Sequence, residues 1–178
     1  MKTVLLTGAN GFIATHIARN LLTDQETSVF ALVRAHDACG APEKLAREWW
    51  DYPELVEALG KSIQAVAGDV SQPNFGLQTD KYAEIVEKTT HIIHTAADWR
   101  LLPLEELRKT NFQGTANVIA FAKDVYKHHG LERLSHVSTA YVAGGAKGVI
   151  YEDQLSDEFG FFTDYEQSKY EGEKLLQE

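Results

Sequence analysis

"TVLLTGANGFIA", residues 3–14, is the stretch that decides the fold. Its first part, residues 3–7, is apolar and β-branched and predicts a buried parallel strand. From Phe12 onward apolar residues recur at helical spacing, which predicts a helix of about three turns. Gly8 and Gly11 stand between the two patterns. The first predicted unit is therefore a strand, a glycine turn and a helix.

The same alternation continues along the chain. Helical patterns occupy residues 104–129, predicted as one long helix, residues 81–89, and residues 43–59, predicted as two short helices interrupted at Pro53. Between most of them lie four further predicted strands: SVFALV (28–33), SIQAVAGDV (62–70), HIIHTAA (91–97) and LSHVSTAYV (134–142). Alternating strands and helices predict an α/β fold, a doubly wound parallel sheet with right-handed crossovers and strand order 3-2-1-4-5.

Composition narrows the class of protein. The chain has 178 residues, 44% apolar and 24% charged, which is enough for the core of one domain. A formal net charge of -9 argues against nucleic-acid or anionic-membrane partners and favours small molecules or proteins. The single cysteine, Cys39, allows no intramolecular disulfide and suits a reducing, cytoplasmic compartment. No signal peptide, membrane span or metal site is expected.

The glycine turn predicts a dinucleotide site. Gly8 permits a tight turn, and Gly11 lets the backbone approach a pyrophosphate at the start of the following helix. Ala14 stands where a third glycine would allow the closest packing of helix on strand. A purely structural turn would also need one glycine. The position after the first strand and before the first helix favours dinucleotide binding.

The end of the second strand predicts the form of the cofactor. A carboxylate there suits the ribose of NAD, whereas a cation suits the 2′-phosphate of NADP. The sequence has Arg34, whose planar donor fork matches a phosphate, with Asp37 nearby. We therefore expect NADP, with NAD as the alternative.

Three other strand ends carry candidate site residues. Asp69 and Val70 could contact an adenine, although Gly-Asp is also an ordinary turn pair, and the small residues of HTAA (94–97) would let the backbone lie against ribose and nicotinamide. Ser138 and Thr139 bring hydroxyls to the ligand-binding edge of the fifth strand, and alternation turns them to opposite sides. Tyr165 and Lys169 lie one turn apart on a following helix, and each of these side chains also has an ordinary packing or surface role open to it.

Taken in order, these motifs resemble a known family. "TGANGFIA", "GDV", "HTAA", "NFQGT", "HVSTAYV" and "YEQSK" look like the extended branch of the short-chain dehydrogenase/reductase superfamily, which has a Rossmann-type domain. The match is closer to the thioester-reductase and fatty-acyl-reductase group, also called the male-sterility-type NAD-binding domain, through "ALVRA", "GDVSQPNFGL", "IIHTAAD" and "HVSTAYV".

The resemblance implies two sets of site residues. The implied catalytic set is Thr139, Tyr165 and Lys169, with Ser138 preceding the catalytic hydroxyl and Asn111 ordering the site. Tyr165 and Lys169 also belong to the implied cofactor-binding set, whose other members are Thr7, Gly8, Asn10, Gly11, Phe12, Ile13, Arg34, Asp69, Val70, Thr95, Ala96 and Ala97. Hydride addition to a carbonyl creates an oxyanion that hydroxyls can stabilise, and a cation beside a tyrosine favours its phenolate.

The expected function is reduction of an acyl thioester or related carbonyl, small or carrier-bound, by NADPH. The alternatives are a nucleotide-sugar epimerase or dehydratase of the same superfamily and a non-catalytic NADP-binding module. Family members continue past the Tyr-x-x-x-Lys helix, so we expect residues 1–178 to be the cofactor-binding domain alone, without its substrate subdomain. Its fifth strand would then be an exposed edge, and a homodimer is one way to cover it.

Overall fold

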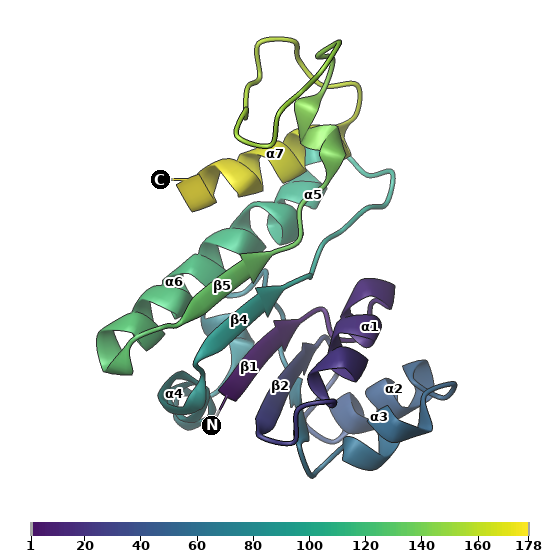
Figure 1. Ribbon diagram of the computed structural model, residues 1–178, viewed down its shortest axis with the longest axis vertical. Coiled ribbons are helices and arrows are strands. Elements are labelled where there is room, and N and C mark those ends of the chain that lie inside the picture. Colours follow the sequence, from purple (N-terminus) through teal and green to yellow (C-terminus); the bar gives the residue numbers. More distant parts are fainter. Residues whose placement is uncertain (1, 178) are drawn as a thin grey trace.

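The computed structural model describes residues 2–177 and contains one five-stranded, all-parallel sheet in the order β3-β2-β1-β4-β5 (Figure 1). The predicted α/β fold and strand order are confirmed. Thr7, at the end of β1, pairs with Leu32 on one side and with His94 on the other. The strands are β1 (Lys2–Thr7), β2 (Thr27–Val33), β3 (Ile63–Ala67), β4 (His91–His94) and β5 (Arg133–His136).

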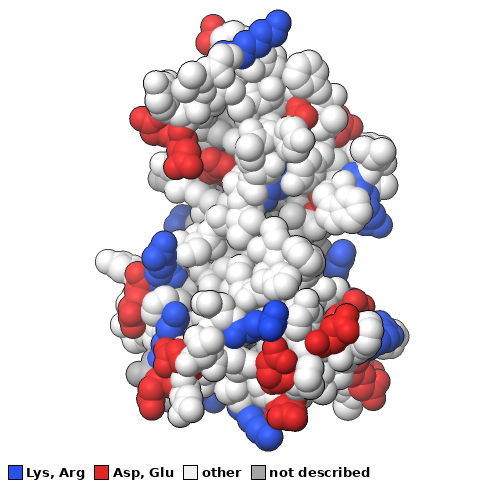
Figure 2. All heavy atoms as spheres, turned by 45° about the vertical axis from the view of Figure 1, so that its right-hand side comes forward, with Lys and Arg blue, Asp and Glu red and all other residues white. Residues whose placement is uncertain are grey.

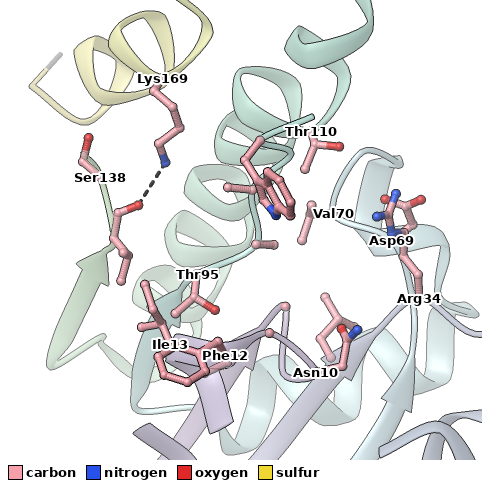
Figure 3. Close-up of a pocket in the computed structure, with 18 of the residues that line it drawn as sticks. Asn10, Phe12, Ile13, Arg34, Asp69, Val70, Thr95, Thr110, Ser138 and Lys169 are labelled. Atoms are coloured by element: carbon pink, nitrogen blue, oxygen red, sulfur yellow. Dashed lines mark hydrogen bonds between the residues drawn. The ribbon is translucent and has the colours of Figure 1, made fainter. Parts of the chain in front are cut away.

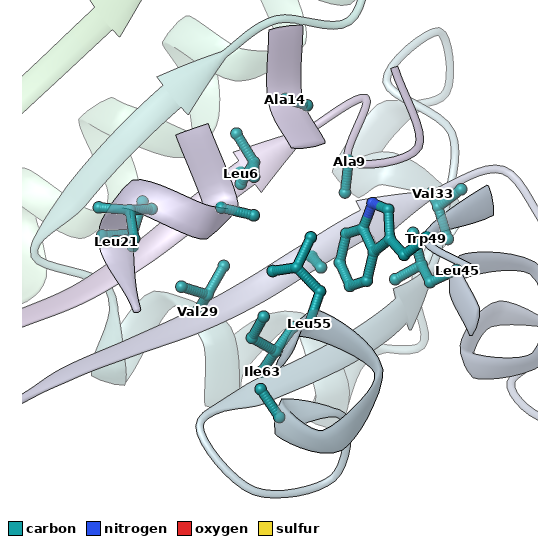
Figure 4. Close-up of a cluster of buried hydrophobic side chains, with 14 of the residues drawn as sticks. Leu6, Ala9, Ala14, Leu21, Val29, Val33, Leu45, Trp49, Leu55 and Ile63 are labelled. Atoms are coloured by element: carbon teal, nitrogen blue, oxygen red, sulfur yellow. The ribbon is translucent and has the colours of Figure 1, made fainter. Parts of the chain in front are cut away.

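Helices cover both faces of the sheet, which explains why the inner strands β1 and β2 carry consecutive buried apolar residues. Leu6 points into a cluster under α1 (Phe12–Leu21), α2 (Gly40–Glu48) and α3 (Pro53–Ala58). The neighbouring Leu5 points into the cluster under α4 (Thr79–Lys88) and α6 (Gln113–His129). In the first cluster Trp49 is fully buried (Figure 4), and its indole N–H donates to the hydroxyl of Thr15 at 3.1 Å.

Three strands end earlier than the sequence predicts. β3, β4 and β5 stop at Ala67, His94 and His136, and the chain after each leaves the sheet toward its ligand-binding edge. Residues 140–142, predicted as strand, instead belong to a short 3-10 turn, η2 (Ala140–Ala143), because the hydroxyl of Thr139 accepts a hydrogen bond from the backbone N–H of Tyr141. After β3 comes a second such turn, η1 (Pro73–Gly76).

The predicted single helix over residues 104–129 is wrong in one respect. It is divided at Phe112 into α5 (Leu104–Asn111) and α6, although the hydrogen bond from the Phe112 N–H to the Arg108 carbonyl continues the ladder. The last helix, α7 (Asp164–Gln177), crosses this junction closely: a Cβ on Gly172 would lie 2.4 Å from the carbonyl oxygen of Asn111. The division therefore sits where two helices are in backbone contact.

Beyond the C-terminal ends of the strands, α5, α7, η2 and the irregular residues 144–163 form a separate upper layer (Figure 1). Between its two helices, an ion pair joins Arg108 of α5 to Glu171 of α7 at 2.6 Å. Figure 2 shows few lysines or arginines on this part of the surface. Its exposed large apolar side chains are Tyr141, Val149, Ile150, Tyr151, Phe159 and Phe162. Within residues 2–177, no helix has the length and apolar character needed to cross a membrane.

Candidate active site

A cleft of about 450 Å³ lies at the C-terminal edge of the sheet, between the β1 turn and α7. This is the edge at which doubly wound sheets bind ligands, and the volume suits a small molecule. Figure 3 shows Lys169 and Ser138 at one end and Arg34 and Asp69 at the other. The predicted site residues that line the cleft are Gly8, Asn10, Gly11, Phe12, Ile13, Arg34, Asp69, Val70, Thr95, Ala96, Ala97, Ser138, Tyr165 and Lys169.

The floor of the cleft is the glycine turn. Gly8 has a φ of 67°, and a Cβ there would lie 2.8 Å from Cα of Ala96, so only glycine fits without strain. Gly11 precedes α1 and makes no side-chain cap, which leaves the first N–H groups of the helix free for an anion. Phe12 and Ile13, expected from spacing to be helical, are exposed at this helix start and line the cleft.

One end of the cleft holds a cation. Arg34 follows β2, and among the described residues no carboxylate lies within ion-pair distance of it. The carboxylate of Asp37 is turned to the backbone N–H of Gly40, at 2.8 Å, and does not line the cleft. Asp69 accepts a hydrogen bond from the N–H of Ser71 at 2.9 Å, so one carboxylate oxygen stabilises its own turn.

Thr7, at the end of β1, holds the turn after β4 through hydrogen bonds. Thr7, predicted to bind cofactor, is fully buried and does not line the cleft. Its hydroxyl lies 2.7 Å from Nδ1 of His94 and accepts hydrogen bonds from the N–H groups of Thr95 and Ala96 at 3.2 and 3.3 Å. Thr7 therefore acts through the backbone of residues 95–96, which does line the cleft.

The other end of the cleft carries Tyr165 and Lys169, the phenol and amine expected from the motifs, together with the hydroxyl of Ser138. The ammonium of Lys169 donates to the carbonyl oxygen of Val137 at 2.9 Å, and burial lowers the pKa of Lys169 to about 8. Burial raises the pKa of Tyr165, and a hydrogen bond from Thr139 partly opposes that shift. Thr139 itself does not line the cleft, whereas Ser138 does and donates to the carboxylate of Glu173.

Asn111 lies behind this end and holds three segments together. Its Oδ1 accepts from the N–H of Asp98 at 2.7 Å, and its Nδ2 donates to the Asp98 carbonyl at 2.8 Å and to the hydroxyl of Ser168 at 2.9 Å. The residue is buried and outside the cleft. It thus orders the loop after β4 against α5 and α7.

Several residues of the site escaped the motif reasoning. Glu173 stands one turn after Lys169 on the same face of α7, and that spacing alone could have revealed it. Glu173 does not line the cleft. Six lining residues were not named as site residues, and four of them lie within the quoted motifs: Ala14, Leu32, Gly68 and Val137. Trp99 and Thr110 lie outside those motifs.

Comparison with known proteins places the chain in a family. A family model described as "Male sterility protein", an NAD-binding family, matches residues 6–178. The chain belongs to this male sterility protein family. The match extends over both ends of the cleft, from the glycine turn to α7, so the nucleotide-binding turn and the Tyr165–Lys169 helix fall within one family pattern.

Relatives of this male sterility family member include named reductases. It is 34% identical to the L-2-aminoadipate reductase large subunit of Penicillium chrysogenum over 99% of the chain and 14% of that protein. The crystal structure of the terminal R domain from the myxalamid PKS-NRPS biosynthetic pathway superposes with a TM-score of 0.85 and 27% identity, over 99% of this chain and 45% of that one. A UDP-glucuronic acid 4-epimerase from Bacillus cereus, solved with NAD, shares the fold at a TM-score of 0.71 and 22% identity, over 98% and 51% of the two chains.

Proposed function

We propose that the chain is the cofactor-binding and catalytic part of an NADPH-dependent reductase that acts on an acyl thioester or a related carbonyl. The observation that carries the proposal is the placement of Lys169 and Tyr165 at one end of a single cleft, with the glycine turn as its floor and Arg34 at the far end. Because the chain spans 14% of the named reductase and 45% of the R domain, the proposal leaves the acyl group unassigned.

The cleft fits a nicotinamide dinucleotide. The glycine turn and the uncapped start of α1 offer backbone N–H groups to a pyrophosphate. The 2′-phosphate of NADP would lie near Arg34, since the end of the second strand is where such folds recognise that ribose. The Asp37 carboxylate, which could have favoured NAD, accepts a hydrogen bond from the Gly40 N–H at the start of α2.

The chemistry follows from the groups at the other end. A reduced nicotinamide, when bound, supplies the hydride. Tyr165 and Thr139 stabilise the developing oxyanion by hydrogen bonds, and Tyr165 delivers the proton. Lys169 lowers the energy of the phenolate through its positive charge. With a thioester, hydride addition gives a hemithioacetal, which loses its thiol to leave an aldehyde.

A titration of the chain with NADPH and NADH tests the cofactor assignment. We expect tighter binding of NADPH, and Arg34→Ala should weaken NADPH binding by about tenfold or more, because a charge-assisted phosphate contact is lost. NADH affinity should stay unchanged. Arg47→Ala, an exposed arginine on α2, is the matched control and should change neither affinity. Equal affinity of the wild type for both cofactors would contradict the 2′-phosphate contact.

The reaction itself is tested by following NADPH oxidation with acyl-CoA, acyl-pantetheine and carrier-bound thioesters in parallel with UDP-sugars. Consumption of NADPH with thioesters alone supports the reductase. Conversion of a UDP-sugar without net cofactor consumption would favour an epimerase instead, and cofactor binding without either reaction would favour a non-catalytic module.

A further inference from the structure

Lys169 is a buried cation that needs a nearby negative charge. The residue is 2% exposed, and its ammonium contacts the Val137 carbonyl at 2.9 Å and Nε2 of His136 at 3.5 Å. Both contacts are neutral acceptors. A buried ammonium without an anion is costly and tends to lose its proton.

The two histidines beside Lys169 cannot supply that charge. Burial lowers the pKa of His94 on β4 well below its usual value and lowers the pKa of His136 on β5 to about 4, so both rings are neutral at pH 7. Tyr165, on α7, is also neutral because burial raises its pKa. The Glu171 carboxylate on α7 is paired with Arg108 of α5, which donates two hydrogen bonds to it at 2.6 and 2.7 Å.

Glu173 is the carboxylate that faces this cluster. It lies one helical turn after Lys169, so the two side chains leave α7 on the same side. The hydroxyl of Ser138, one residue beyond the carbonyl that Lys169 contacts, donates to Glu173. The negative charge of Glu173 raises the pKa of Lys169 and so opposes the larger effect of burial, which lowers that pKa to about 8.

We propose that Glu173 is a positioning residue of the site: its charge keeps Lys169 protonated, and its carboxylate accepts the hydrogen bond of the Ser138 hydroxyl, which then does not donate to the substrate. The effect of Glu173 on the charge of Lys169 does not depend on the proposed function, whereas its effect on the reaction rests on that function.

The hydrogen bond to Glu173 decides which of the two hydroxyls, Ser138 or Thr139, can donate in the reaction. A serine has a single O–H to donate, so Ser138 can only accept further bonds while it donates to Glu173. Thr139 accepts a long bond of 3.3 Å from the N–H of Tyr141 and directs its own proton to Tyr165, whose pKa this hydrogen bond lowers. Glu173 therefore assigns the donor role beside Tyr165 to Thr139.

The test is an NMR titration of the cofactor-free chain labelled with ¹³C-lysine, with the Lys169 resonance assigned by its loss in Lys169→Arg or by through-bond correlation. Glu173→Gln removes the charge but keeps an acceptor for Ser138. We expect it to lower the titration midpoint of Lys169 by about one unit, the effect of removing one opposite charge nearby. Glu171→Gln, the same change on the side of α7 that meets α5, is the control and should leave the midpoint close to that of the wild type.

One further variant completes the test. Ser138→Ala removes the hydrogen bond and keeps the charge, so the Lys169 midpoint should stay near the wild-type value. An unchanged midpoint in Glu173→Gln or an equal shift in Glu171→Gln would overturn the proposal. Because no cofactor is present, failure of NADPH binding would leave this result unaffected.

Discussion

The ammonium of Lys169 donates a 2.9 Å hydrogen bond to the carbonyl oxygen of Val137 from a position that is almost entirely closed to solvent. This relationship ties α7 to the end of β5 and places a cation where burial disfavours charge. Burial lowers the Lys169 pKa to about 8, below the value of about 10.4 expected in the unfolded chain. The unfolded state therefore binds more protons than the folded state between these two pH values.

The first prediction is a pH dependence of stability that Lys169 causes. Because the unfolded chain holds the extra proton, the free energy of unfolding of the wild type should rise relative to that of Lys169→Met by about 2 kcal/mol between pH 7 and pH 10. The destabilising effect of the buried charge is fully present below pH 8 and disappears as the pH rises. Urea unfolding of both proteins at several pH values measures the difference. A constant difference across this range would contradict the buried cation.

The second prediction concerns Asn111. Asn111→Ala removes three hydrogen bonds and leaves the N–H and carbonyl of Asp98 without these partners in a buried place, so we expect a loss of about 3 kcal/mol in the free energy of unfolding. Ser168→Ala is the comparison, because it removes one of these bonds and leaves the Asp98 backbone paired. Its expected cost is about 1 kcal/mol. Equal losses in the two variants would show that the bonds to Asp98 contribute nothing extra.

The fold was predictable because its signals are local and repeated. Apolar strands such as residues 3–7, each followed by a glycine or by helical spacing, predict a doubly wound sheet. This prediction does not depend on the paths of the loops. The end of the long predicted helix was also correct. What failed was its continuity: the division falls at Phe112, beside the Asn111 carbonyl that Gly172 approaches, and this contact joins segments far apart in the chain.

The gathering of most candidate residues in one cleft was predictable for the same reason. Gly8, Arg34 and Lys169 sit at strand ends or on a helix face, positions that the order of elements determines. Trp99 lines the cleft from an irregular loop, whereas the side chain of Thr7 contacts His94 and does not line the cleft. Both placements depend on tertiary packing, which the pattern of a single strand does not predict.

The third prediction tests the contact between α7 and the α5–α6 junction. A methyl group at Gly172 would approach the carbonyl oxygen of Asn111 to 2.4 Å, and backbone cannot yield as a flexible side chain can. We expect Gly172→Ala to lower the free energy of unfolding by about 2 kcal/mol despite the better helix propensity of alanine. Gly40→Ala in α2 meets only ordinary contacts, the nearest at 3.5 Å, and should be neutral or slightly stabilising. Thermal or urea unfolding of the two variants decides the matter, and a stabilised Gly172→Ala would mean that the helices separate easily.

The last prediction compares the hydroxyls at the catalytic end. Tyr165→Phe should lower turnover by about 10²–10⁴-fold and leave NADPH affinity nearly intact, because the phenol donates a proton in the reaction and the ring keeps its place. Thr139→Val should also reduce turnover, by about tenfold or more, whereas Ser138→Ala should change it little, since Ser138 already donates to Glu173. Tyr151→Phe, an exposed tyrosine of the irregular segment, is the control and should behave as the wild type. Steady-state oxidation of NADPH with a thioester, together with a cofactor titration for each variant, measures both quantities. If Ser138→Ala were as damaging as Thr139→Val, the two hydroxyls would share the oxyanion and the assignment to Thr139 would fail.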